Sequence, residues 1–380
     1  MKKTGKTLVT SSIMLLSLLT QLAYADETTT KPVEEKKMET AAVVMPQIKI
    51  EGYVDTYYAI DTDTSVLPQS ADKRLQNTRT LNAIGFRKNE VNINTAQVSA
   101  SINADWYRSK LSIAYGTIPL QSWPASYLNL QEANLGFKLR DNLWLDGGLF
   151  LTHIGGESLL PRYNWLSTLS LTTMFEPFYQ GGVKLTFKPI EQFEMQLHLL
   201  NGYGLLEAVN PYPSFGWLFN YTPMSNFTAV YSGYAGNPNA NGAATAVRLF
   251  HDVNLSYQIT EKFGLRGEVD VATQSDIQSI YHSEFLTAHY DFTPMFNVSL
   301  RGEYVNDEKG MLSAYPNLKD AGITGAGVTL GGEFKPSTNS YVRLEGRELI
   351  LDANKNKIFK SGNDATSNRF ELMLSSGIWF

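Results

Sequence analysis

Cysteine is absent from the 380 residues, so the fold has no disulfide and no cysteine-based metal site. Long apolar runs are nearly absent too. After a run from about Leu8 to Ala23, no stretch of about 20 apolar residues follows, which argues against a transmembrane helix. Positive charge is also scarce. Removing residues 1–25 with their three lysines leaves 29 basic and 37 acidic residues, a net charge of −8, which argues against nucleic acid as a partner.

The amino terminus has the pattern of an export signal. Lys2, Lys3 and Lys6 precede the apolar run, and Ala23 and Ala25 supply the small residues that a signal peptidase inspects. Residues 1–25 are therefore predicted to be a signal peptide. Residues 26–46 mix acids and lysines with almost no aromatics, and they are interpreted as a flexible polar leader that plugs, tethers or floats. One domain is expected over residues 47–380.

The carboxy terminus alternates and ends on an aromatic residue. Phe370, Leu372, Leu374, Ile378 and Phe380 share one strand face, while smaller or polar residues share the other. This pattern suits a wall between lipid and water. The strand ending in Phe380 is expected to be the segment that the barrel-assembly machinery recognises. The 20 Tyr and 19 Phe favour aromatic girdles at the membrane interfaces, with a tyrosine-rich sandwich core as the alternative.

Short and long connections alternate along the chain. Turns with similar chemistry recur, as in the segments 187–193, 221–227, 292–296 and 334–341, each with aromatic residues near the turn. Seven short turns and eight longer polar loops are predicted. This asymmetry is typical of an outer-membrane barrel, with short periplasmic turns and long extracellular loops.

The expected fold is all-β, a transmembrane antiparallel up-and-down β-barrel of about sixteen strands. Because the second, eighth and twelfth segments alternate poorly, fourteen or eighteen strands are alternatives. The predicted segments are 48–60, 89–102, 106–117, 131–139, 143–153, 177–187, 193–203, 216–221, 227–234, 247–258, 263–272, 281–291, 296–305, 323–334, 340–351 and 368–380.

Several segments resemble a known family. They are GYVDTYY (52–58), NEVNIN (89–94), LWLDGGLFLTHIGGE (143–157), PFYQGGVKLTF (177–187) and LLNGY (199–203). In this order and spacing they look like the OmpL-like β-barrel porin family of Gram-negative outer membranes, over roughly residues 48–260. The resemblance implies an outer-membrane porin surrounded by lipid. It implies no set of functional residues.

Strand parity predicts a charged lumen. A charged side chain on the lipid face of a barrel costs about 2 to 4 kcal/mol at the midplane, so charges that alternate with aliphatics should point inward. The alternative is a ladder of cross-strand pairs that only stiffens the wall. The predicted pore-lining residues are Lys49, Glu51, Asp55, Lys138, Lys184, Arg266, Glu268, Asp270, Arg301, Glu303, Arg343, Glu345 and Arg347.

The loop 154–176 is the candidate constriction. It is long, carries Glu157, Arg162 and Glu176, and contains an apolar run at 165–171. By analogy with general porins it is expected to fold inward and narrow the pore. The alternative is an extracellular loop that packs on its neighbours.

The sequence favours a channel over an enzyme. The five histidines, His153, His198, His251, His282 and His289, lie in no recognisable nucleophile motif, and neither a cofactor nor a metal is predicted. The first hypothesis is a porin for passive diffusion of ions and small hydrophilic solutes, with a homotrimer as a candidate assembly. The second is a surface adhesion barrel with a plugged lumen that binds through its extracellular loops.

Overall fold

The computed structural model describes residues 46–65, 77–314 and 322–380. The predicted signal peptide and, except for Pro46, the predicted leader lie outside these residues. Among the described residues, none of the helices has the length and hydrophobicity needed to cross a bilayer.

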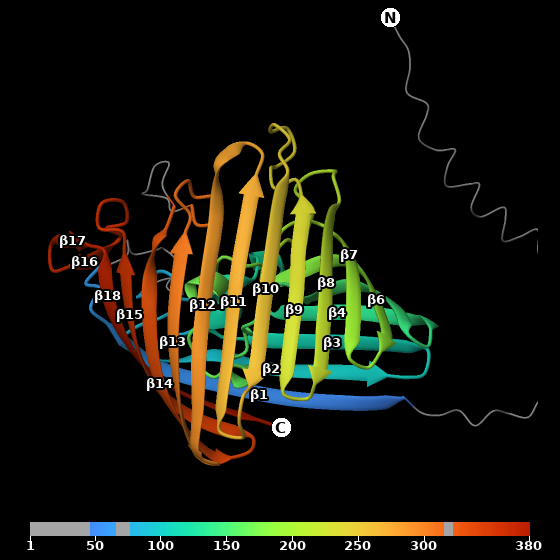
Figure 1. The fold of residues 1–380 in the computed structure, drawn as a ribbon, viewed down its shortest axis with the longest axis horizontal. Helices are drawn as coiled ribbons and strands as arrows, with labels where there is room; N and C mark the ends of the chain where they lie inside the picture. Colours follow the sequence, from blue (N-terminus) through green and yellow to red (C-terminus); the bar gives the residue numbers. More distant parts are fainter. Residues whose placement is uncertain (1–45, 66–76, 315–321) are drawn as a thin grey trace, which may run out of the picture. The chain divides into compact units, whose positions relative to one another are not determined.

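Sixteen antiparallel strands form one closed barrel in which each strand pairs with its neighbours in sequence (Figure 1). The strands are β1 (Gln47–Asp61), β2 (Val91–Asn103), β3 (Tyr107–Tyr115), β4 (Leu130–Arg140), β5 (Leu143–Leu151), β6 (Tyr179–Ile190), β7 (Phe193–Leu200), β8 (Ser214–Met224), β9 (Phe227–Gly236), β10 (Arg248–Gln258), β11 (Phe263–Gln274), β12 (Ile277–Thr293), β13 (Phe296–Asn306), β14 (Thr324–Ser337), β15 (Ser340–Leu351) and β18 (Asn368–Trp379). The predicted class and strand number are confirmed.

The last strand closes the barrel against the first. Val54 of β1 lies opposite Ile378 of β18, and Gly52 and Phe380 exchange backbone hydrogen bonds of 3.2 and 3.1 Å. Gly52 leaves room for the Phe380 ring, because a Cβ at this position would lie 2.2 Å from it. Closure satisfies the backbone polar groups that an open sheet edge would leave unpaired in lipid.

Each strand presents two different faces. On β15, Val342 and Leu344 are exposed on the outside, whereas Arg343, Glu345 and Arg347 are buried inside. Because lipid replaces water around the barrel, the outward aliphatics belong to the hydrophobic band and the inward charges must find partners within the lumen.

β12 is longer than the predicted segment 281–291, and its weak alternation has a structural reason. Glu284 is paired in register with Val269 and Tyr304, whose side chains lie on the outer face, so this carboxylate is on the outer face as well. His282 lies two residues away on the same face, with its ring centroid 5.7 Å from that of Tyr304. Polar residues on the outer face break the expected pattern.

Small elements occupy the long loops. They are α2 (Thr117–Ser122), η2 (Ala125–Tyr127), η3 (Pro161–Tyr163), α3 (Leu171–Met174) and the hairpin of β16 (Phe359–Ser361) with β17 (Asp364–Thr366). None of them was predicted. The short turns are closed locally: Thr260 and Thr293 each accept a hydrogen bond of 3.0 Å through Oγ1 from the backbone N–H three residues later.

Candidate functional site in the barrel lumen

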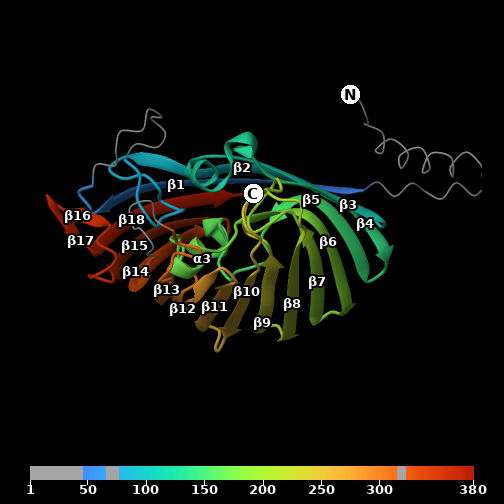
Figure 2. The same ribbon diagram turned by 90° about the horizontal axis from the view of Figure 1, so that it is seen from above.

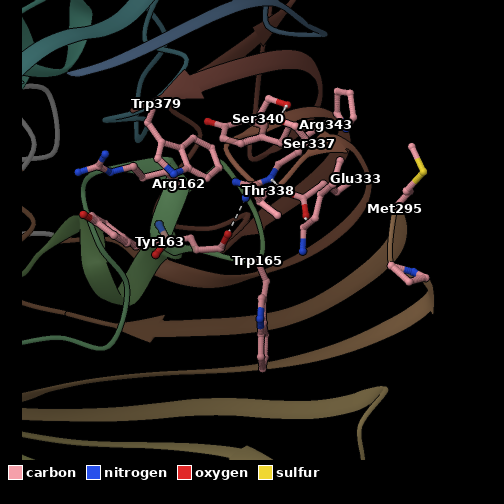
Figure 3. A pocket seen from close by; sticks show the side chains of 15 residues that line it. Arg162, Tyr163, Trp165, Met295, Glu333, Ser337, Thr338, Ser340, Arg343 and Trp379 are labelled. Atoms are coloured by element: carbon pink, nitrogen blue, oxygen red, sulfur yellow. Dashed lines mark hydrogen bonds and ion pairs between the residues drawn. The ribbon is translucent and has the colours of Figure 1, made fainter. Parts of the chain in front are cut away.

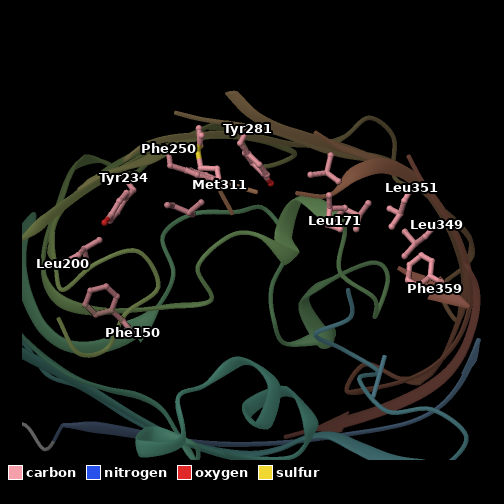
Figure 4. Close-up of a cluster of buried hydrophobic side chains, with 14 residues drawn as sticks. Phe150, Leu171, Leu200, Tyr234, Phe250, Tyr281, Met311, Leu349, Leu351 and Phe359 are labelled. Atoms are coloured by element: carbon pink, nitrogen blue, oxygen red, sulfur yellow. The ribbon is translucent and has the colours of Figure 1, made fainter. Parts of the chain in front are cut away.

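The connection between β5 and β6, residues 152–178, folds into the barrel and is called the inner loop below (Figure 2). Its apolar side chains Leu166, Leu169 and Leu171 are buried. Leu171 belongs to a cluster with the wall residues Tyr281 and Leu349 (Figure 4). The candidate constriction loop therefore lies against the inner wall.

Two arginines of the wall hold the inner loop. Arg301 of β13 donates to the carbonyl oxygen of Thr168 at 2.6 Å and to the carboxylate of Glu157 at 2.9 Å. Arg343 of β15 donates to the carbonyl oxygens of Pro161 at 2.9 Å and Asn164 at 2.7 Å. A guanidinium carries five donors, which lets one side chain bind several loop carbonyls together.

Two acids of the wall hold the same loop through its backbone N–H groups. Glu303 accepts from Leu171 at 2.6 Å, and Glu345 accepts from Thr168 at 3.0 Å. Arg347 forms an ion pair of 2.8 Å with Glu303. These wall residues lie inside the barrel but contact the inner loop or one another rather than open solvent.

Asp55 joins the closing strands. Its carboxylate accepts from the Tyr341 hydroxyl and, at 2.5 Å, from the side-chain amide of Asn94. Tyr53 lies beside it, with its hydroxyl 2.8 Å from that of Tyr341. Asp55 is fully buried and binds β2 and β15 to β1, so its contacts are those of a structural residue.

Residues 77–88 also fold inward, which the sequence did not indicate. Arg79 pairs with Glu371 and lies 3.3 Å from Asp61, while Arg369 pairs with Glu371 from the same strand. All four side chains are buried. The alternation of Arg369 and Glu371 with the predicted outward residues of the last strand carried the signal for this inward pair.

A cavity of about 470 Å³ remains inside the barrel next to the short turns of the first seven strands. Lys49, Glu51 and Lys184, predicted from the sequence, are among its lining residues. Five further charged residues that line it were not predicted from the sequence, namely Arg108, Lys110, Glu132, Asp146 and Glu194. Their strands are short or irregular in sequence, so parity alone did not identify them.

Six of the eight charged residues around this cavity form three ion pairs. Arg108 contacts Asp146 through two nitrogens, at 2.6 and 2.5 Å, and Lys110 contacts Glu132 at 2.5 Å. Lys49 lies 3.1 Å from Glu51 and is well exposed. Lys138, the remaining predicted residue on this side, lies over the Trp144 ring at 5.7 Å. In the pairs of Arg108 and Lys110 the carboxylate is buried and the basic side chain is partly exposed, so the basic group is the part of each pair that water reaches.

A second pocket of about 650 Å³ lies between the inner loop and the short turns at 294–295 and 336–338 (Figure 3). Arg162, Trp165 and Trp379 are among the residues that line it. Arg162 lies over the Tyr53 ring at 5.2 Å, and Arg266 of β11 lies over the Trp165 ring at 4.9 Å. These contacts attach the middle of the inner loop to the wall.

Three remaining predicted residues meet where the inner loop contacts β11. Glu176 approaches Glu268 and Asp270 of β11, with one carboxylate oxygen of each within 4.8 Å of the others. Glu157, by contrast, is neutralised by Arg301 and accepts the backbone N–H of Ser170 at 2.7 Å. The acids of the inner loop thus have different surroundings.

His153 of the inner loop packs against the wall of the barrel. His153 Nε2 lies 3.0 Å from the carbonyl oxygen of Gly233, and its ring stacks on His198 at 4.1 Å. Burial lowers the pKa of His153 to about 4, so the ring is neutral at pH 7. These contacts give His153 a packing role.

A closed sixteen-stranded barrel with apolar residues outside, charges inside and an inward-folded loop defines the class of outer-membrane porins. A family model described as "Putative beta-barrel porin-2, OmpL-like" matches residues 47–380. The chain belongs to this family, and its place is the outer membrane of a Gram-negative bacterium. The porin family and fold suggest a channel without enzymatic activity.

The barrel is similar to solved porin structures. An anion-selective porin from Comamonas acidovorans has a TM-score of 0.59 at 12% identity, covering 88% of this chain and 100% of that one. The outer membrane channel DcaP of Acinetobacter baumannii gives 0.56 at 11%, covering 88% and 97%. OmpT of Vibrio cholerae gives 0.54 at 13%, covering 88% and 98%. At these identities the likeness concerns the fold. A search of curated proteins found no match.

Proposed function

We propose that the barrel is a diffusion channel for ions and small hydrophilic solutes. The observation that carries this proposal is the cavity of about 470 Å³, which is lined by charged side chains of both signs. A barrel of sixteen strands is too wide for its own side chains to fill, so space beside the inner loop is expected to hold water. Passage would be passive, with ions exchanging between the paired charges.

In this channel the inner loop is the constriction. Arg162, at the pocket near the short turns, is the loop charge nearest to passing solutes in our proposal, because Glu157 is bound by Arg301 and Glu176 is buried. The wall residues Arg301, Glu303, Arg343 and Glu345 act by holding the loop in place.

A second candidate is a surface-binding barrel with a plugged lumen. It is favoured by a buried apolar cluster made largely by loops, which contains Ile84, Ile118, Trp123, Leu159 and Leu169. A cluster of this kind seals space between the inward-folded segments. In that case the outer loops would bind the target and no ions would pass.

The surroundings of the barrel follow from the same proposal. Residues 1–25 would direct export, and residues 26–46 would remain as a leader. The strand ending in Phe380 would contact the barrel-assembly machinery, and lipid would cover the outer band. A homotrimer is the proposed assembly; the OmpT of Vibrio cholerae has been solved in a trimer form.

Planar-bilayer recording of the refolded protein distinguishes the two candidates. A diffusion channel is expected to give stepwise conductance increases as single barrels insert. A barrel that shows the heat-dependent gel mobility of a folded outer-membrane protein but gives no steps would favour the plugged, surface-binding alternative.

Ion preference should depend on the cavity charges. Four basic and four acidic residues line the cavity, so the reversal potential across a salt gradient should be small. Neutralising two acids with Glu51→Gln and Glu194→Gln should shift it toward anion preference, and the mirror variant Lys49→Gln with Lys184→Gln should shift it toward cations. If neither double variant moves the potential, ions do not pass along this lining.

A further inference from the structure

Four carboxylates meet between the inner loop and the wall. Glu176 follows α3, Glu268 and Asp270 belong to β11, and Asp252 of β10 lies opposite Asp270 in the strand register. Each side chain is at most 6% exposed. Three of the acids belong to the paired neighbouring strands β10 and β11, and the inner loop brings Glu176 to them from a distant part of the sequence.

These acids lack the basic partners that other buried acids have. Glu303, Glu333 and Glu371 each form an ion pair with an arginine. Within residues 46–65, 77–314 and 322–380, no lysine or arginine forms an ion pair with any of the four carboxylates. Arg266 is the neighbouring cation on β11, and its guanidinium lies over the Trp165 ring.

Five carboxylate oxygens of the four acids accept no hydrogen bond from the described residues. Both carboxylate oxygens of Asp270, Oε1 of Glu268, Oε1 of Glu176 and Oδ2 of Asp252 are buried and unpartnered among the described residues. Burial, together with the carboxylates of Asp270 and Asp252, raises the pKa of Glu176 well above its usual range. Unpaired buried carboxylates are costly, which calls for a positive ligand or for protons.

One oxygen each of Glu268 and Asp252 accepts hydrogen bonds from neighbouring groups. Glu268 Oε2 accepts from the backbone N–H of Gly156 at 2.6 Å. Asp252 Oδ1 accepts from the Ser232 hydroxyl at 2.9 Å and from the Asn254 amide at 3.0 Å. With these oxygens fixed, the other oxygens of the two carboxylates remain free for a ligand within the cluster.

A glycine lets the loop approach this closely. Gly155 has a φ of +99°, and a Cβ at this position would lie 1.9 Å from Glu176 Oε2. A side chain at Gly155 would therefore displace the carboxylate of Glu176. The backbone at 155–156 is thus part of the site that surrounds the carboxylates. Gly155 approaches Glu176 closely, and the N–H of Gly156 donates to Glu268.

We propose that Glu176, Asp252, Glu268 and Asp270 form a binding site for a hard divalent cation, with Ca²⁺ as the preferred ion. Calcium takes six to eight oxygen ligands in flexible geometry, whereas magnesium keeps several waters and rarely occupies a cage built by protein alone. Bound there, the cation joins the end of the inner loop to β10 and β11. The site does not require that the barrel conducts.

Protein refolded from inclusion bodies, and hence free of lipopolysaccharide, provides the test. After treatment with a chelator, calorimetric titration at pH 7 should detect one Ca²⁺ per chain. Ca²⁺ should also raise the midpoint temperature of unfolding, and excess chelator should reverse the rise. Mg²⁺ titrated in the same way should bind more weakly.

The double variant Glu268→Gln with Asp270→Asn should lose the Ca²⁺-dependent rise. Its midpoint without the ion should equal or exceed that of the chelated wild type, because two mutually repelling charges are gone. The control Glu51→Gln with Glu194→Gln removes the same charge from the cavity and should keep the rise. Absence of binding in the wild type, or equal binding by the first double variant, would overturn the proposal.

Discussion

Replacing residues 158–172 by a short glycine and serine linker is expected to raise the single-channel conductance severalfold. The segment contains Leu166, Leu169 and Leu171, which are buried in the lumen, and its removal widens the narrowest part of the proposed path. The shortened loop keeps Glu157, which still neutralises Arg301. The remaining wall charges would face water, so the closed sheet is expected to persist. Bilayer recording of single insertions measures the change.

A matched control shortens a loop whose residues are exposed. Residues 240–243 lie between β9 and β10, and each of them is exposed. Their deletion should leave the conductance unchanged. An unaltered conductance of the 158–172 variant, in a barrel with normal heat-dependent gel mobility, would show that the inner loop is not the constriction.

The barrel was predictable because each side chain of the wall points either to lipid or to the lumen, and its own polarity indicates which. Val342 and Leu344 alternate with Arg343 and Glu345, and only one orientation avoids charges in lipid. This rule needs no knowledge of distant partners, so a single sequence is enough to find the strands and their inward charges. It fails at Glu284, where a carboxylate lies on the outer face next to Tyr304.

The partners of the inward charges were not predictable. Arg343 binds the carbonyl oxygen of Asn164, 179 positions away in the sequence, and Glu345 binds Thr168 at a separation of 177. The alternation along a strand indicates that such side chains point inward. It does not indicate whether they contact water or a loop inside the barrel. The meeting of Glu176 with Glu268 and Asp270 was hidden for the same reason, although all three had been selected individually.

Among the variants proposed for this protein, Arg343→Met is expected to lower the free energy of unfolding the most. It removes the partner of the buried Glu333 and the donors to the carbonyl oxygens of Pro161 and Asn164. Breaking a buried ion pair by removing one partner costs on the order of 3 to 5 kcal/mol, because the other charge stays buried. Urea unfolding of the refolded barrel in detergent measures the difference in free energy.

A matched control is available because Glu333 also contacts a second, more exposed cation. Lys335 lies 3.2 Å from Glu333 with its side chain 41% exposed, whereas Arg343 is 5% exposed. Lys335→Met should therefore cost at most about 1 kcal/mol, the usual range for solvent-exposed pairs. Adding Glu333→Gln to Arg343→Met should recover part of the loss, because the unpaired charge disappears. Equal costs for the two single variants would mean that water reaches Glu333 and that Arg343 does not hold the inner loop.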